Sequence, residues 1–181
     1  LIALSQMTGR SFNMTIPNVD AVPASTLTDL IGGPEVATVA VLMPYEGDVE
    51  GEMAYLFPWE SGQRLWQLLL GSAPQGFDEI SELHMSVVLE IGNIINSSFL
   101  NAISEMTDLK MHATPPAFAL DMACSIADEI VTDAEVREAV ALAVETVIYD
   151  TEEETKGYFV LIPTRETLQT LFERLGIADA A

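Results

Sequence analysis

An acidic residue and an amide stand one helical turn apart in this chain, with a serine and a proline at fixed distances from them. The pattern is Ser86-x3-Glu90-x2-Asn93, followed after twenty-two residues by Pro116. The spacing i, i+4, i+7 places the first three on one face of a helix. A carboxylate can bind a cation, and a carboxamide can both donate and accept hydrogen bonds. On a rigid helix the pair could present a reagent to another molecule.

The pattern lies in the stretch Ser81–Met106, whose periodicity predicts one long helix. Ser97 extends the polar stripe by one more turn. A separate stripe is apolar and is expected to face a core: Leu83, Val87, Ile91, Ile94, Ile95, Phe99 and Ile103. Gly92 costs about 1 kcal/mol relative to alanine inside a helix. We expect its missing side chain to let a partner approach the helix closely.

The chain contains an internal repeat. Leu1–Pro17 aligns with Leu100–Pro116 at an offset of 99 residues, with seven of seventeen positions identical. A second match follows in the same order. In each copy twelve residues separate a proline from a glycine, Pro58 and Gly71 in the first copy and Pro163 and Gly176 in the second. The repeat predicts a duplicated unit of about a hundred residues within one domain, residues 1–181. Residues 1–71 would be the first copy and residues 77–176 the second, joined by the linker 72–76.

Each copy is expected to follow the order αβαββα. Val36–Tyr45 is β-branched and alternating, which predicts a strand, and Ala139–Asp150 is assigned as its counterpart. Hairpin turns are expected at residues 46–48 and at residues 150–156, and an amphipathic helix after Pro58. The predicted fold is α/β (α+β), a pseudo-twofold molecule with one mixed sheet packed against two long helices.

Composition excludes several classes of function. The formal net charge is −21, from 28 acidic and 7 basic side chains, which argues against nucleic acids and anionic membrane surfaces as partners. The sequence shows no signal peptide and no apolar run that we expect to span a bilayer. The single Cys124 fits a reducing cytoplasm. His84 and His112 lie far apart without ligands at metal-binding spacing, so no metal site is expected.

The pattern of serine, glutamate, asparagine and distant proline resembles the signature of the CheC, CheX and FliY phosphatases of bacterial and archaeal chemotaxis. Glu90-Ile91-Gly92-Asn93 matches the acidic-amide core of that signature, and Pro116 falls at its distance. The likeness extends over nearly the whole chain, including Ile31–Pro34 and Gly51–Pro58, and is closest to CheC.

The resemblance implies hydrolysis of the phosphoaspartate on the CheY response regulator. By motif position, Asn93 would orient the attacking water and Glu90 would pair with the receiver's catalytic lysine. Ser86 would assist the contact, and Pro116 would shape the turn that supports the helix. The resemblance implies no cofactor in this chain, because the Mg²⁺ ion would sit on the receiver. It also implies CheD, a receptor-modifying deamidase, as a second partner.

Two other interpretations of the function remain open. One is a module whose main task is to bind CheD, for which the segment Met122–Val131 is the candidate surface. The other is a FliY-like or FliM-like domain of the flagellar switch, although the intact acid and amide argue against FliM. The repeat adds an expectation about the site: a first-copy counterpart of Asn93 would lie seven residues before Leu1, so this chain would carry the second of two sites.

Overall fold

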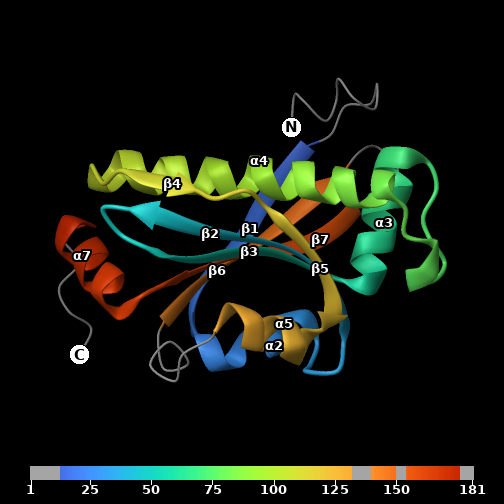
Figure 1. Cartoon of the computed structure of the whole chain (residues 1–181), viewed down its shortest axis with the longest axis horizontal. Coiled ribbons are helices and arrows are strands. Elements are labelled where there is room, and N and C mark those ends of the chain that lie inside the picture. The colour runs from blue at the N-terminus through green and yellow to red at the C-terminus, as the bar shows by residue number, and fades with distance from the viewer. Residues whose placement is uncertain (1–12, 132–139, 150–153, 176–181) are drawn as a thin grey trace.

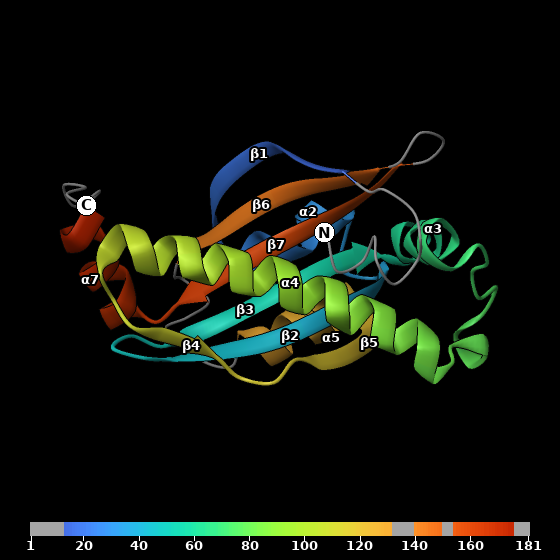
Figure 2. The ribbon, with the colours of Figure 1, turned by 90° about the horizontal axis from the view of Figure 1, so that it is seen from above.

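The computed structural model describes residues 13–131, 140–149 and 154–175. A curled antiparallel sheet of seven strands forms the centre of the molecule (Figures 1 and 2). Its strand order is β1-β6-β7-β3-β2-β4, and β5 also pairs with β2. The strands are β1 (Asn13–Pro23), β2 (Ala37–Gly47), β3 (Gly51–Pro58), β4 (Met111–Ala113), β5 (Ala117–Met122), β6 (Val140–Tyr149) and β7 (Glu154–Pro163).

The predicted strand Val36–Tyr45 and the strand assigned as its counterpart in the repeat are confirmed as β2 and β6. The prediction of a mixed sheet is wrong, because every pairing among the described strands is antiparallel. The pairs β2–β3 and β6–β7 join consecutive strands, and a short connection between neighbouring strands reverses the chain direction. The pairings between distant segments, such as β1 with β6, also run in opposite directions.

Helices cover both faces of the sheet (Figure 1). The long helix α4 (Glu82–Thr107) lies across one face, and α2 (Leu27–Ile31) and α5 (Ala123–Ile130) lie on the other. The amphipathic helix predicted after Pro58 is confirmed as α3 (Trp59–Leu70), which lies at the opposite end of the sheet from α7 (Arg165–Leu175). Two single-turn 3-10 helices complete the described elements, η1 (Ala24–Thr26) and η2 (Phe77–Glu79).

Alternation along the central strands divides the core into two layers. On β2, the side chains of Val39, Val41 and Met43 belong to the layer beneath α4. Ala40 and Leu42 belong to the layer packed against α2 and α5. Because both faces of the sheet are buried, the middle of β2 is an almost continuous apolar run. The sheet is therefore a rigid support for the helix that carries the serine, glutamate and asparagine pattern.

The two halves of the chain interleave in the sheet. The hairpins β2–β3 and β6–β7 meet at the centre through β3 and β7. The first strand of the chain, β1, pairs with β6 of the later hairpin, and β5 pairs with β2 of the earlier hairpin. Each half therefore supplies a strand to the outer side of the other half's hairpin.

Some predictions fall outside the described residues. Of the two long helices expected, one is described, as α4, and the other falls largely on residues 1–12. In the turn expected at residues 150–156, only residues 154–156 are described, and they already belong to β7. Contrary to expectation, α4 is long and apolar enough to span a membrane when only its length and composition are considered. A buried core helix can meet the same two criteria. One face of α4 packs on the sheet.

Candidate active site

The helix α4 is 26 residues long, and its first turn is fixed by a reciprocal cap. The Ser81 side chain accepts a hydrogen bond from the backbone amide of His84, while the imidazole Nδ1 of His84 accepts one from the Ser81 amide at 3.1 Å. The indole Nε1 of Trp66 on α3 also donates to the His84 carbonyl oxygen at 2.8 Å. The helix ends at Asp108, which adopts the left-handed conformation with φ 57°. The predicted bounds Ser81–Met106 are thus confirmed to within a residue.

The inner face of α4 follows most of the predicted apolar stripe. Four of its side chains are almost fully buried against the sheet: Val87, Val88, Ile91 and Ile95. Leu83 departs from the prediction, because 59% of its side chain is exposed. It lies in the first turn, and the periodicity of a sequence cannot tell where along a helix the supporting sheet stops.

Gly92 lies on the inner face, and the sequence-based interpretation of this residue is wrong. A Cβ atom at this position would lie 2.6 Å from three side-chain carbons of Val41 on β2. Such a distance is far below van der Waals contact, so only glycine allows α4 to approach β2 this closely. The missing side chain serves packing within the chain, not approach by a partner.

The outer face of α4 carries the polar stripe. Ser86 and Asn93 are exposed, while Glu90 and Ser97 are half-buried. The Ser97 hydroxyl donates to Oδ1 of Asn93 at 3.5 Å, a long hydrogen bond that still favours one orientation of the amide. The Ser86 hydroxyl donates to the Glu82 carbonyl oxygen at 2.8 Å, so its hydrogen is used within the helix and only its lone pairs remain for a partner.

Glu90 has no recorded ion pair or side-chain hydrogen bond among the residues that the structure describes. The sequence of α4 contains no lysine or arginine that could neutralise it. A half-buried carboxylate without a counter-ion on its own helix is available to a cation from outside. Together, Glu90 and Asn93 present an acid and an amide one turn apart, and no described residue neutralises the acid.

Pro116 lies in the short connection between β4 and β5 and is half-buried. Both strands pair with β2 and contact α4, so this connection runs alongside the helix. Proline has no backbone N–H to donate to a ladder, and the β2 pairing is interrupted here. The structure thus brings the proline segment and the helix of the signature together on one edge of the sheet.

Asn96 lies outside both the polar and the apolar stripe predicted from the sequence. It is 0% exposed, and within the described ranges neither Oδ1 nor Nδ2 of its side chain has a hydrogen-bond partner. Leaving a buried amide unsatisfied costs about 1–3 kcal/mol. Its position one turn after Gly92 is the signal that could have identified it, because residues i and i+4 share a helix face.

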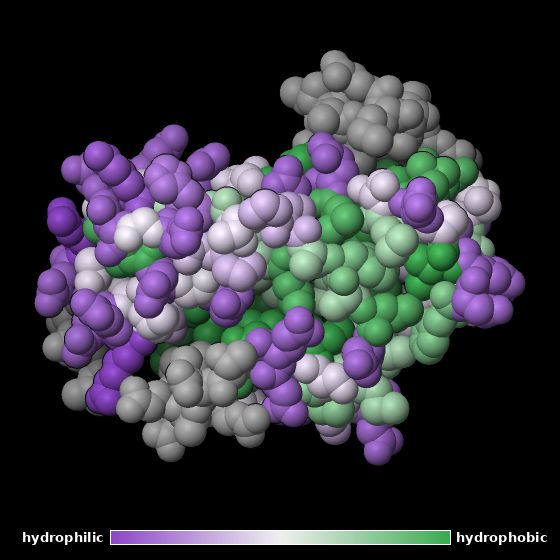
Figure 3. All heavy atoms as spheres, in the orientation of Figure 1, coloured by the Kyte–Doolittle hydropathy of each residue, from purple (hydrophilic) through white to green (hydrophobic). Residues whose placement is uncertain are grey.

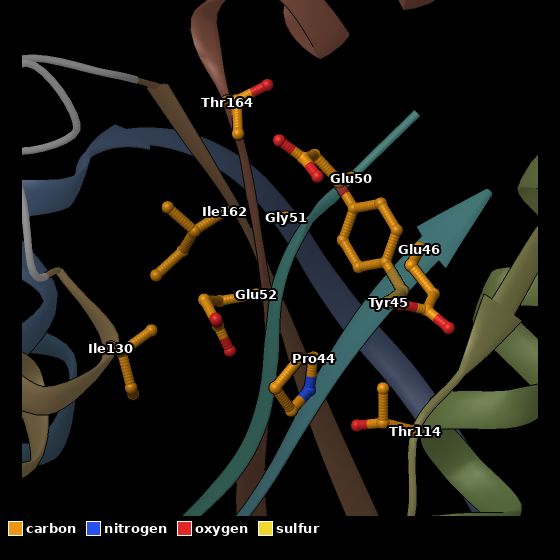
Figure 4. Close-up of a pocket in the computed structure, with 10 residues that line it drawn as sticks. All are labelled: Pro44, Tyr45, Glu46, Glu50, Gly51, Glu52, Thr114, Ile130, Ile162 and Thr164. Atoms are coloured by element: carbon orange, nitrogen blue, oxygen red, sulfur yellow. The ribbon is translucent and has the colours of Figure 1, made fainter. Parts of the chain in front are cut away.

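A cleft lies away from α4, at the end of the sheet where β2, β3 and β7 meet α5 (Figure 4). Its volume is about 320 Å³, and three of its lining residues are acidic: Glu46, Glu50 and Glu52. Burial, and to a smaller degree the charge of Glu129, raises the pKa of Glu52 above its ordinary value. None of the lining residues belongs to α4, so the Glu90 and Asn93 pair is an open helix surface and not part of this cleft.

Within the described ranges, no group of histidine, cysteine, aspartate and glutamate side chains is placed to hold a metal ion. His84 is engaged in the helix cap, His112 is exposed on β4, and Cys124 is half-buried on α5. An open surface of this kind suits a reagent offered to a macromolecule, since it encloses no volume for a small substrate.

Comparison with known proteins shows what this chain resembles. Residues 83–120, which contain all four signature residues, match the model of the CheC-like family. The chain is 27% identical to the CheY-P phosphatase CheC of Bacillus subtilis over 178 residues, which cover 96% of this chain and 85% of that protein. The predicted resemblance to the CheC, CheX and FliY family is confirmed.

Solved structures share the fold. The crystal structure of Thermotoga maritima FliY superposes with a TM-score of 0.68 at 18% identity, covering 97% of this chain and 87% of that one. The FliM middle domain from Vibrio alginolyticus superposes with a TM-score of 0.66 at 14% identity, covering 96% of this chain and 91% of that one. These identities are low enough that the likeness shows the fold alone. It confirms the α/β class with a curled antiparallel sheet.

Proposed function

We propose that this chain is a phosphatase that hydrolyses the phosphoaspartate of a CheY-type receiver. The observation that carries the proposal is the pairing of Glu90 and Asn93 one turn apart on the outer face of α4, where none of the described residues forms an ion pair with the acid. The identity of 27% to a CheY-P phosphatase supports the same activity. An open helix surface fits a substrate that is itself a folded protein with a recessed phosphoryl group.

In the proposed mechanism Asn93 enters the receiver's active site and orients a water molecule. The water oxygen forms a bond to phosphorus, the bond from phosphorus to the aspartate oxygen breaks, and the products are inorganic phosphate and a free aspartate carboxylate. An acyl phosphate is already activated, so alignment of the nucleophile supplies much of the acceleration. A carboxamide suits this task because it donates and accepts at once. The hydrogen bond from Ser97 supports one amide orientation.

Glu90 is the proposed docking acid and pairs with the receiver's catalytic lysine. Ser86 assists as an acceptor, since its hydroxyl hydrogen is engaged by the Glu82 carbonyl oxygen. Pro116 holds the connection that runs alongside α4. The chain itself supplies no cofactor in this proposal. The Mg²⁺ ion belongs to the receiver, where it neutralises charge on the phosphoryl oxygens.

A flagellar-switch role is the second candidate, because FliY and FliM share the fold at TM-scores of 0.68 and 0.66. Fold likeness does not separate an enzyme from a structural component. The acid and amide pair favours the phosphatase reading over a FliM-like one. Binding of CheD through the segment Met122–Val131 is proposed as an additional contact, and the protein is proposed to act in the cytoplasm.

We also propose that the chain arose by duplication, with copies at residues 1–71 and 77–176. The exchange of outer strands between the two halves of the sheet supports this, because a pseudo-twofold axis between β3 and β7 would relate β1 to β5. A second site would then belong to the helix of the first copy.

The test of the proposed function is the rate at which a phosphorylated CheY-type receiver loses phosphate with and without the chain. A faster loss of phosphate in which each molecule of the chain acts on many receivers supports the phosphatase. A rate equal to that of the receiver alone would reject it and leave the flagellar-switch reading. Co-elution with CheD, or its absence, tests the additional contact separately.

A further inference from the structure

An apolar surface lies beside Asn93, where α4 meets the edge of the sheet. Met85 and Leu89 contribute to it from α4, and both are half-buried. Leu89 precedes Asn93 by four residues, and Met85 precedes Leu89 by four, so the two lie one and two turns before the amide. Phe118, Leu120 and Met122 contribute from β5. We call these five residues the lateral surface.

The geometry of β5 places its even-numbered side chains on the α4 side of the sheet. Phe118 and Leu120 pack, partly buried, against the core layer beneath α4, whereas Ala119 packs against the opposite layer. Met122 continues the alternation and is 52% exposed. Among the described strands β5 pairs only with β2, so its outer side lies open. The lateral surface therefore runs from the helix to an uncovered sheet edge.

The apolar character of the lateral surface contrasts with the other end of the same face. Figure 3 shows apolar side chains gathered over β5 and the N-terminal half of α4, while hydrophilic side chains cover the end near α7. The chain as a whole carries a net charge of −21. An apolar surface on so acidic a protein is typical of a contact site for a partner.

We propose that the lateral surface is the docking platform for the receiver, a protein partner with apolar side chains beside its lysine and phosphoaspartate. This inference rests on the proposed function. A specific interface covers about 800 Å² on each partner, a patch of about 16 Å radius. Met85 lies eight residues before Asn93, about 12 Å along the helix axis. A receiver that engages Asn93 and Glu90 must therefore also cover Leu89 and Met85, and β5 lies alongside them.

The polar pair on α4 and the lateral surface would contribute differently to receiver binding. Glu90 and Asn93 supply one charge and one amide, which are too few contacts for a stable complex. Burying the lateral surface against apolar side chains would supply most of the affinity. The acid would then select the correct partner and register, because electrostatic contacts contribute more to specificity than to raw affinity.

The test places a carboxylate in the lateral surface with Met122→Glu and, separately, Met85→Glu. Met122 is the residue just before α5, and an acid at a helix N-terminus is tolerated, so this variant should fold. The matched control is Met106→Glu, on α4 but 70% exposed and thirteen residues beyond Asn93. Two quantities are measured: the Kd for a receiver carrying beryllofluoride in place of phosphate, and kcat and KM with the phosphorylated receiver.

We expect each lateral variant to raise Kd and KM by about tenfold or more, since an unpaired charge would be buried in an apolar contact. The value of kcat should stay within about twofold, and Met106→Glu should behave as wild type. Unchanged Kd and KM in both lateral variants would overturn the docking platform while leaving the phosphatase intact. If the wild-type chain binds the receiver but does not dephosphorylate it, the proposed phosphatase function is rejected and the docking platform is not.

Self-association is the competing use of an open apolar edge. If sedimentation shows wild type as a dimer and Met122→Glu as a monomer, with receiver affinity unaffected, the lateral surface belongs to a second copy of the chain. That result would also overturn the inference.

Discussion

Val41 on β2 occupies the space that a side chain at position 92 would need, so Gly92 allows a close approach between α4 and β2. A Cβ at this position would lie 2.6 Å from Val41 side-chain carbons. Asn93 follows directly, and because successive residues on a helix are rotated by about 100°, an inward Gly92 helps to fix Asn93 outward. The packing of Gly92 thereby sets the direction of Asn93, the residue that we propose orients the attacking water.

Replacing Gly92 with alanine should destabilise the protein despite the better helix propensity of alanine. Alanine gains about 1 kcal/mol in an isolated helix, but overpacking against Val41 costs about 1–3 kcal/mol or more. We expect a net loss of stability, measured as a lower denaturation midpoint in urea. Ser98→Ala, at an exposed position on the same helix, is the control and should change the midpoint little. A midpoint for Gly92→Ala at or above that of wild type would show that α4 can move away from β2 without cost.

Asn96→Ala should not show the loss that is usual when a buried side chain is truncated. The Asn96 amide is fully buried, and no residue in the described part of the chain forms a hydrogen bond with either of its polar atoms. Removing it relieves an unsatisfied donor and acceptor worth about 1–3 kcal/mol, which offsets the lost packing. We expect a free energy of unfolding equal to or above that of wild type, measured by urea titration. A loss of about 3 kcal/mol would instead indicate that the amide is hydrogen-bonded in solution.

Glu52 should make stability depend on pH. Burial and the charge of Glu129 raise the pKa of this carboxyl in the folded state above its value in the unfolded chain. The folded state then binds the proton more tightly, so this group's contribution to stability falls as pH rises from the unfolded pKa through the folded one. We expect Glu52→Gln to be more stable than wild type at neutral pH and equally stable once the carboxyl is protonated in both the folded and the unfolded state. Parallel stability profiles for the two proteins across mildly acidic pH would contradict this assignment.

Reversing the charge at Glu90 should weaken the contact with the receiver. In Glu90→Lys a cation would face the receiver's lysine, and we expect KM to rise by about tenfold or more from like-charge repulsion. Glu105→Lys makes the same change at an exposed position on α4 and is the matched control. Turnover at the wild-type KM in Glu90→Lys would remove the docking role from this residue.

The sequence predicted those elements that local patterns determine. The cap at Ser81 and the apolar periodicity that follows it determine where α4 begins and which face is buried, apart from Leu83. The β-branched alternation of Val36–Tyr45 likewise predicted β2. The position of Pro116 beside the helix was implied by the resemblance, and the contacts of β4 and β5 with α4 agree with it.

Features that depend on contacts between distant segments could not be predicted in this way. The order and antiparallel direction of the strands depend on how β1 and β5 join the opposite hairpins. The role of Gly92 depends on Val41, which lies fifty-one positions earlier in the chain. The acidic cleft combines residues from three strands, three connecting loops and α5, and no sequence motif joins them.

The rate of phosphate loss from a phosphorylated CheY-type receiver in the presence of Asn93→Ala tests the central claim most directly. Removing a group that orients the reacting water should lower kcat by about a hundredfold or more. The affinity for the receiver should remain within a few-fold of wild type, because this substitution leaves Glu90 in place. Asn101→Ala, at an exposed asparagine on the same helix, should keep wild-type turnover. Full turnover in Asn93→Ala would contradict the assignment of this residue and of the site built around it.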